Sequence, residues 1–161
     1  AEAQPPNAAP LPLTDAEILA VAHTADQGEI AQARLAQRKS KDARVRALAA
    51  MMLRDHMAAD AKGAAVARKE GLIPTPSETS SALESDANRA TMMLRSQGGS
   101  TFDREYVDTQ VKEHQAVLDM IDQKLVPDAQ DAEVKTFLTE VRAKVAMHLR
   151  HAEELQTKMQ K

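Results

Sequence analysis

The sequence contains no cysteine and very few aromatic residues. Because cysteine is absent from the 161 residues, disulfides, thiolate nucleophiles and cysteine-ligated zinc sites are excluded. Aromatic residues make up 2% of the chain and Trp is absent, so the ring platforms on which single-stranded nucleic acids stack are nearly missing. The sequence also has no Ser/His/Asp catalytic order, phosphate loop or dinucleotide fingerprint. We therefore assign no catalytic residue and expect a protein without enzymatic activity.

An excess of positive charge and long apolar runs are also missing. The formal net charge is -3, whereas a nucleic-acid-binding domain usually presents a basic face. No apolar run approaches the roughly 20 residues that a membrane-spanning helix needs. The chain begins Ala1-Glu2-Ala3 without an initiator Met and continues into a proline-rich stretch. This pattern is typical of an exported protein after removal of its signal peptide, and we expect a periplasmic location.

What the sequence does contain is a series of amphipathic helices. The capping box formed by Thr14 and Glu17 predicts a helix that runs to about Lys39. A short break at 40–42 precedes a second helix, which is expected to end at Gly71 because glycine is the preferred residue just beyond a helix. Since the connection is so short, the two helices should be antiparallel.

The second half of the chain predicts two further long helices, over about 101–125 and 130–160. Between the two halves lie an extended connector with two prolines and a weaker helix over 77–97, long enough to carry the chain from one end of a bundle to the other. The predicted fold is therefore all-α: a four-helix bundle of the ferritin-like type, with a long crossover connection between its second and third helices. We expect residues 14–161 to form this domain and residues 1–13 to form a flexible, proline-rich arm.

Three of the four long helices carry a histidine within an apolar seam. Seam positions recur at steps of three and four residues, and His56, His114 and His148 occupy such positions on the second, third and fourth helices. Glu29 falls near the middle of the apolar side of the first helix. If the crossover makes the second and third helices parallel, His56, His114 and Glu29 lie at similar heights. Counting from a turn near 126–130 places His148 about 9 Å from the level of His114.

These four side chains predict a metal site in the core of the bundle. Imidazole and carboxylate groups suit Zn, Cu, Fe or Ni, so a divalent transition metal is the expected cofactor of Glu29, His56, His114 and His148. The alternative is a structural or stress-related interaction module, in which the buried His/Glu network only sets helix packing. Classical di-iron ferroxidase chemistry is not expected, because no histidine of the chain has a glutamate three residues before it. Neither a nucleic acid nor a membrane span is expected, and no protein partner is indicated.

The sequence also resembles a known family over about residues 14–158. The segments that carry the resemblance are Gly28-Glu29-Ile30, Met51-Met52-Leu53-Arg54-Asp55-His56, Phe102-Asp103-Arg104-Glu105-Tyr106-Val107 with His114, and His148-Leu149. They are similar to the bacterial domain-of-unknown-function family 4142, whose members look like exported, ferritin-like proteins. The resemblance implies a ferritin-like bundle and a periplasmic location, and it implies no established activity. The positions that match the family pattern are Glu29, Asp55, His56, Phe102, Asp103, Tyr106, His114 and His148.

Overall fold

The computed structural model describes residues 9–161, and within them the chain forms helices and no strand. The helices are α1 (Asp15–Lys39), α2 (Ala43–Glu70), α3 (Glu78–Ser96), α4 (Gly99–Met120), the π-helical turn η1 (Ile121–Leu125), α5 (Val126–Asp128) and α6 (Ala132–Met159). The prediction of an all-helical fold is therefore confirmed for these residues. Across the same residues, no helix is both long and apolar enough to cross a membrane.

Local sequence signals account for the helix ends. The capping box predicted at the start of α1 is present, because the Thr14 hydroxyl accepts the Glu17 N–H and the Glu17 carboxylate accepts the Thr14 N–H. The Asp42 carboxylate caps α2 by accepting the Arg44 N–H. Gly71 ends α2 with a φ of 65°, in the left-handed region. Glycine adopts this conformation with little strain because it has no Cβ atom. The glycine stop that the sequence predicts is thus confirmed.

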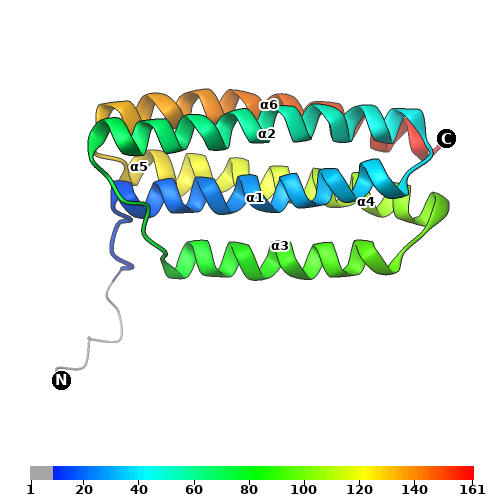
Figure 1. Cartoon of the computed structure of the whole chain (residues 1–161), viewed down its shortest axis with the longest axis horizontal. Helices are drawn as coiled ribbons and strands as arrows, with labels where there is room; N and C mark the ends of the chain where they lie inside the picture. Colours follow the sequence, from blue (N-terminus) through cyan, green and yellow to red (C-terminus); the bar gives the residue numbers. More distant parts are fainter. Residues whose placement is uncertain (1–8) are drawn as a thin grey trace, which may run out of the picture.

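The four long helices contact one another in a closed circuit. α1 packs against α2 and α4 packs against α6, while α2 also contacts α6 and α1 also contacts α4. Figure 1 shows α2 and α4 running in the same direction, as the position of the 77–97 helix predicts. α3 lies on the outside of α1 and α4, on the side away from α2 and α6 (Figure 1). It carries the chain from the end where α2 finishes to the end where α4 begins.

The close packing of α3 on α1 depends on a glycine. A Cβ atom added to Gly28 would lie 2.9 Å from the Cβ of Ala87, closer than two carbon atoms approach in folded proteins. The two backbones therefore approach each other only because residue 28 has no side chain. As a result, α3 is held against the middle of α1, beside the residues described below.

The helix expected over 101–125 continues further than the sequence indicates. The Val126 N–H donates to the Ile121 carbonyl across the π-helical turn, and α5 then extends the path to Asp128. Pro127, which has no N–H, is the second residue of α5. Residues 1–8 of the predicted arm lie outside the described part of the chain. Of its remaining residues, Leu13 is buried and its N–H donates to the Asp128 carboxylate.

The apolar core consists of two clusters. One gathers residues from the start of α1, the end of α2, η1 and the start of α6, including Ile18, Val66, Leu125 and Leu138. The other gathers residues from the end of α1, the starts of α2 and α4 and the end of α6, including Met52 and Phe102. A buried layer of polar side chains separates them, made of Asp26, Glu29, Gln32, His56, Gln110, His114 and His148.

Candidate metal centre

Three histidines meet in the polar layer between the two apolar clusters. His56 comes from α2, His114 from α4 and His148 from α6, and each is at least 94% buried. One nitrogen of each imidazole lies within 4.8 Å of a nitrogen of the other two. The Nε2 atoms of His56 and His114 are 3.4 Å apart, close to the roughly 3.3 Å that separates two nitrogens bound at 2.0–2.1 Å to a tetrahedral Zn²⁺.

The outward nitrogen of each ring is held by an oxygen atom. His56 Nδ1 lies 2.8 Å from Asp26 Oδ1, and His148 Nε2 lies 2.9 Å from Asp55 Oδ2. His114 Nδ1 donates to the Gln110 carbonyl oxygen at 2.9 Å, four residues earlier on the same helix. Oxygen partners of this kind fix the ring orientation and the tautomer of metal-binding histidines.

The Gln110 carbonyl and the ionised Asp55 place protons on the outward nitrogens of His114 and His148, and a proton on His56 Nδ1 then leaves three lone pairs facing inward. With protons on the outward nitrogens, His56 Nε2 and His114 Nε2 point their lone pairs toward each other across 3.4 Å. His148 Nδ1 is buried and has no hydrogen-bond partner within the protein. Lone pairs brought this close repel unless a proton or a cation lies between them, so the arrangement is chemically suited to a metal ion.

Burial keeps the three imidazoles neutral. Loss of hydration, with repulsion from His114, lowers the pKa of His56 to about 3. Burial lowers the pKa of His114 and of His148 to about 4, although the hydrogen bonds to Gln110 and Asp55 act in the opposite direction. Since imidazole binds metal only in its neutral form, these groups are ready to act as ligands at neutral pH.

The two orienting carboxylates have different charge states. Burial, reinforced by the nearby Asp60, raises the pKa of Asp26 to about 8. Burial also acts to raise the pKa of Asp55, but hydrogen bonds from Arg54 and His148 outweigh it and lower the pKa to about 2. Asp55 is therefore a fixed negative charge behind His148, and it stabilises positive charge on the cluster side of that ring.

Glu29, the fourth predicted ligand, lies on the outer side of the cluster. Its Oε1 is 3.6 Å from His114 Nδ1, the nitrogen that faces away from the other two histidines. Glu29 is thus next to the centre, but it is not in the group whose ligand atoms lie within 4.8 Å of one another. Its carboxyl group instead contacts that of Glu113 on α4.

The height predicted for His148 is wrong. The sequence places His148 about one and a half turns from His114, yet the centroids of the two rings are 5.4 Å apart. The reason is that α5 continues the helical path beyond Leu125, where the predicted helix ends, to Asp128. Because α5 ends at Asp128 and α6 begins at Ala132, His114 lies 14 residues before the end of α5 and His148 lies 16 residues after the start of α6. His23 and His151 are exposed and stay outside the cluster.

Asp26 and Asp55 were not assigned a role from the sequence, although both orient a histidine. A signal for Asp26 exists, because Ala22, Asp26, Glu29 and Ala33 follow the same three-and-four rhythm along α1. Asp55 matches the family pattern, but it is next to His56 in the chain. The sequence therefore does not indicate that its hydrogen-bond partner is the distant His148. Neighbouring residues on a helix point about 100° apart, so Asp55 faces α6 and bonds His148.

Together, the fold and the site define a class of protein: an all-helical chain with a buried three-histidine cluster able to hold a metal ion. The sequence profile of a family described as a domain of unknown function, DUF4142, matches residues 1–155, and the chain belongs to that family. No curated protein and no solved structure matches the sequence.

The stability of the metal-free protein is expected to fall as the pH rises from 7 to 8.5. Burial raises the pKa of Glu29 to about 7, and burial with the Glu29 charge raises that of Glu113 to about 8; Asp26 also titrates near 8. The folded state therefore holds protons that the unfolded carboxyl groups have already lost. This stabilisation is lost as the pH rises through the folded-state pKa values. The free energy of unfolding falls by about 1.4 kcal/mol per pH unit for each proton that only the folded state holds.

Urea unfolding in the presence of a chelator measures this change. In this range the unfolded histidines are mostly neutral, so their lowered pKa values contribute little. Glu113→Gln should show a shallower decline than the unaltered protein. A stability that rises between pH 7 and 8.5 would contradict the assignment of protons to these carboxyl groups.

Replacing Asp55 by Asn is expected to weaken Zn²⁺ binding by about 10- to 100-fold, the usual effect of losing a partner behind a metal-binding histidine. The amide keeps the shape of the side chain but removes the charge that faces His148 Nε2. Competition with a chromophoric chelator measures the affinity. Asp108→Asn, an exposed change on α4 whose carboxylate accepts from Gln156, is the control and should leave the affinity unchanged. Equal affinities in both variants would rule out the orienting role of Asp55.

Proposed function

We propose that this chain is a periplasmic, ferritin-like four-helix bundle that binds a divalent transition metal without classical di-iron ferroxidase chemistry. In this proposal α1, α2, α4 and α6 are the four helices of the bundle, and α3 is the crossover between the second and the third. The metal ligands are His56 Nε2, His114 Nε2 and His148 Nδ1. The observation that carries the proposal is the set of three buried nitrogens facing inward, with an oxygen atom behind each ring.

The donor set limits the metal to the later divalent transition ions. Three imidazoles suit Zn²⁺, Cu²⁺, Ni²⁺ or Fe²⁺, whereas Mg²⁺ and Ca²⁺ prefer oxygen ligands. Three protein ligands leave a fourth position for water or for an external ligand. Glu29, the fourth residue predicted from the sequence, is left out of this ligand set, because its Oε1 atom lies on the Nδ1 side of His114.

A second candidate function rests on the contact between His56 and His114. An N–H···N hydrogen bond across their 3.4 Å separation would join the two rings without a metal. The cluster would then be part of a buried polar network that sets helix packing in a structural or stress-related interaction module. This alternative leaves His148 Nδ1 buried without a partner, a cost that metal binding removes.

Metal analysis after purification without an affinity tag tests the proposal. The unaltered protein is expected to retain a stoichiometric transition metal, and the His56→Ala/His114→Ala variant is expected to lose it. His151→Ala, which removes an exposed histidine from α6 three residues after His148, should retain the metal. Equal metal content in the unaltered protein and the double variant would refute metal binding at this cluster.

A further inference from the structure

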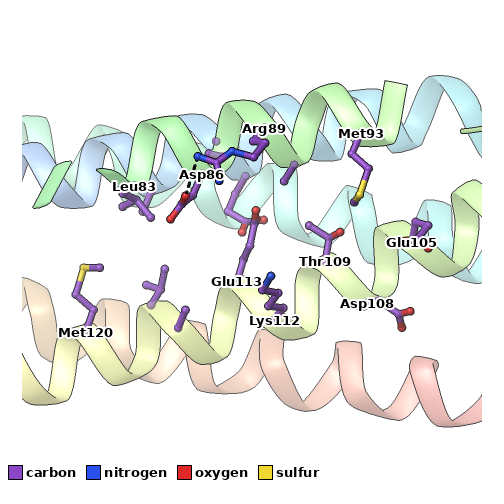
Figure 2. A pocket seen from close by; sticks show the side chains of 17 residues that line it. Leu83, Asp86, Arg89, Met93, Glu105, Asp108, Thr109, Lys112, Glu113 and Met120 are labelled. Carbon is purple, nitrogen blue, oxygen red and sulfur yellow. Dashed lines mark ion pairs between the residues drawn. The ribbon is translucent and has the colours of Figure 1, made fainter. Parts of the chain in front are cut away.

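A cleft between α3 and α4 leads to a second group of buried oxygen atoms. The cleft has a volume of about 510 Å³ and apolar walls that include Leu83, Met93 and Met120. Figure 2 shows the Glu113 side chain rising from α4 into this space, with the Asp86–Arg89 ion pair on α3 opposite. Glu29, on α1, also lines the cleft. The cleft thus connects solvent with two carboxyl groups.

The two carboxyl groups are in contact and are incompletely paired. Glu29 is 95% buried, and its Oε2 atom has no hydrogen-bond partner among the described residues. Glu113 Oε1 accepts from the Gln32 amide at 3.1 Å, and the Glu113 carboxyl group also contacts that of Glu29. Two carboxylates in contact away from water repel strongly unless a proton or a cation lies between them.

Other buried polar atoms without partners lie beside this pair. The Gln110 amide contacts the Glu29 carboxyl group, and its Oε1 atom is unpaired. The Tyr106 hydroxyl is also buried and unpaired, one helical turn before Gln110 on α4. Polar groups left buried without partners are rare in native proteins. Here two such oxygen atoms, Gln110 Oε1 and the Tyr106 hydroxyl, accompany the unpaired Oε2 atom of Glu29.

We propose that Glu29 and Glu113, at the base of the cleft between α3 and α4, form a second cation site that takes a divalent ion preferring oxygen ligands. This site is separate from the three-histidine centre. The His114 ring lies between the carboxylate site and the three-histidine centre. Its Nε2 atom faces His56 and its Nδ1 atom faces Glu29. Carboxylate oxygens with water from the cleft are the ligands that Mn²⁺, Mg²⁺ or Ca²⁺ prefers.

Mn²⁺ titration followed by electron paramagnetic resonance tests this site in a variant that lacks the histidine centre. In the His56→Ala/His148→Ala background, Mn²⁺ is expected to bind with a stoichiometry of one per chain, seen as loss of the six-line signal of the free ion. Adding Glu113→Gln or Glu29→Gln should abolish this binding. Adding Glu105→Gln, which removes the same charge from the rim of the same cleft, should leave it intact.

Three results would overturn the proposal: no Mn²⁺ binding in the histidine-free background, equal binding after Glu113→Gln, or equal loss with Glu105→Gln. If the histidine-free background loses a Mn²⁺ ion that the unaltered protein binds, Glu29 belongs to one mixed centre and the separate site is refuted. Helical circular dichroism identifies variants that do not fold. Glu113, which is only partly buried, provides a milder change than Glu29. The experiment does not depend on Zn²⁺ binding. The carboxylate site can therefore be refuted while the histidine centre is upheld, and the histidine centre can be refuted while the carboxylate site is upheld.

Discussion

Addition of Zn²⁺ to the metal-free protein is expected to raise its melting temperature by about 5–10 °C. The reason is that an ion bound by three inward-facing nitrogens binds the folded state and not the separated helices. At a free Zn²⁺ concentration 100 times the dissociation constant, the stabilisation is about 2.7 kcal/mol. For a domain of this size each kcal/mol corresponds to roughly 2–4 °C.

Differential scanning fluorimetry or calorimetry measures this shift, and excess chelator should reverse it. His56→Ala/His148→Ala is expected to show no Zn²⁺-dependent shift, because one nitrogen is too few to hold the ion. The same measurement separates the two candidate functions. A buried network that only sets helix packing predicts equal melting temperatures with Zn²⁺ and with chelator, and that result would favour the interaction module.

Truncation of Phe102 to Ala is expected to destabilise the protein by about 3–5 kcal/mol, the usual range for a buried Phe in a close-packed core. Phe102 is fully buried in the first turns of α4 and stacks on Tyr106 with a centroid distance of 6.2 Å. The amino group of Lys39 lies 5.4 Å above its ring. Removal of the ring leaves a cavity at the start of α4, and urea unfolding measures the loss.

The matched control for Phe102→Ala is Met92→Ala on α3. The Met92 side chain is 69% exposed, so its truncation should change the stability by no more than about 0.5 kcal/mol. Because Phe102 is twelve residues from His114, about 18 Å along the helix, the Zn²⁺ affinity of the folded variant should change little. A loss below about 1 kcal/mol for Phe102→Ala would show that the cavity collapses or fills.

The sequence predicts the histidines of this centre better than their partners. His56, His114 and His148 stand out because each interrupts an apolar seam, and seam position alone predicts that a side chain faces the core. The histidines are therefore found before any distance is known. Glu29 was found by the same argument, and it does lie in the buried layer.

The pairing of these groups could not be read from the sequence, because it depends on helix rotation and height. Asp55 and His56 are neighbours in the chain, yet they serve different histidines. Glu113 and His114 are neighbours too, yet one faces the cleft and the other faces the cluster. The height of His148 depends on the path of residues 121–131, where a π-helical turn and a short helix replace the simple turn that Pro127 indicates.

The division of the core into two apolar clusters has a consequence for cooperativity. Each cluster packs its own set of apolar side chains, and the polar layer between them contributes little hydrophobic stabilisation, so we expect each cluster to behave as a local folding unit. One end of the helical assembly is thus able to open while the other stays closed. An ion bound to His56, His114 and His148 ties α2, α4 and α6 together at the boundary between the units. With the metal bound, we expect backbone amides at both ends to exchange with solvent in a single concerted opening, and after its removal each end should exchange at its own rate.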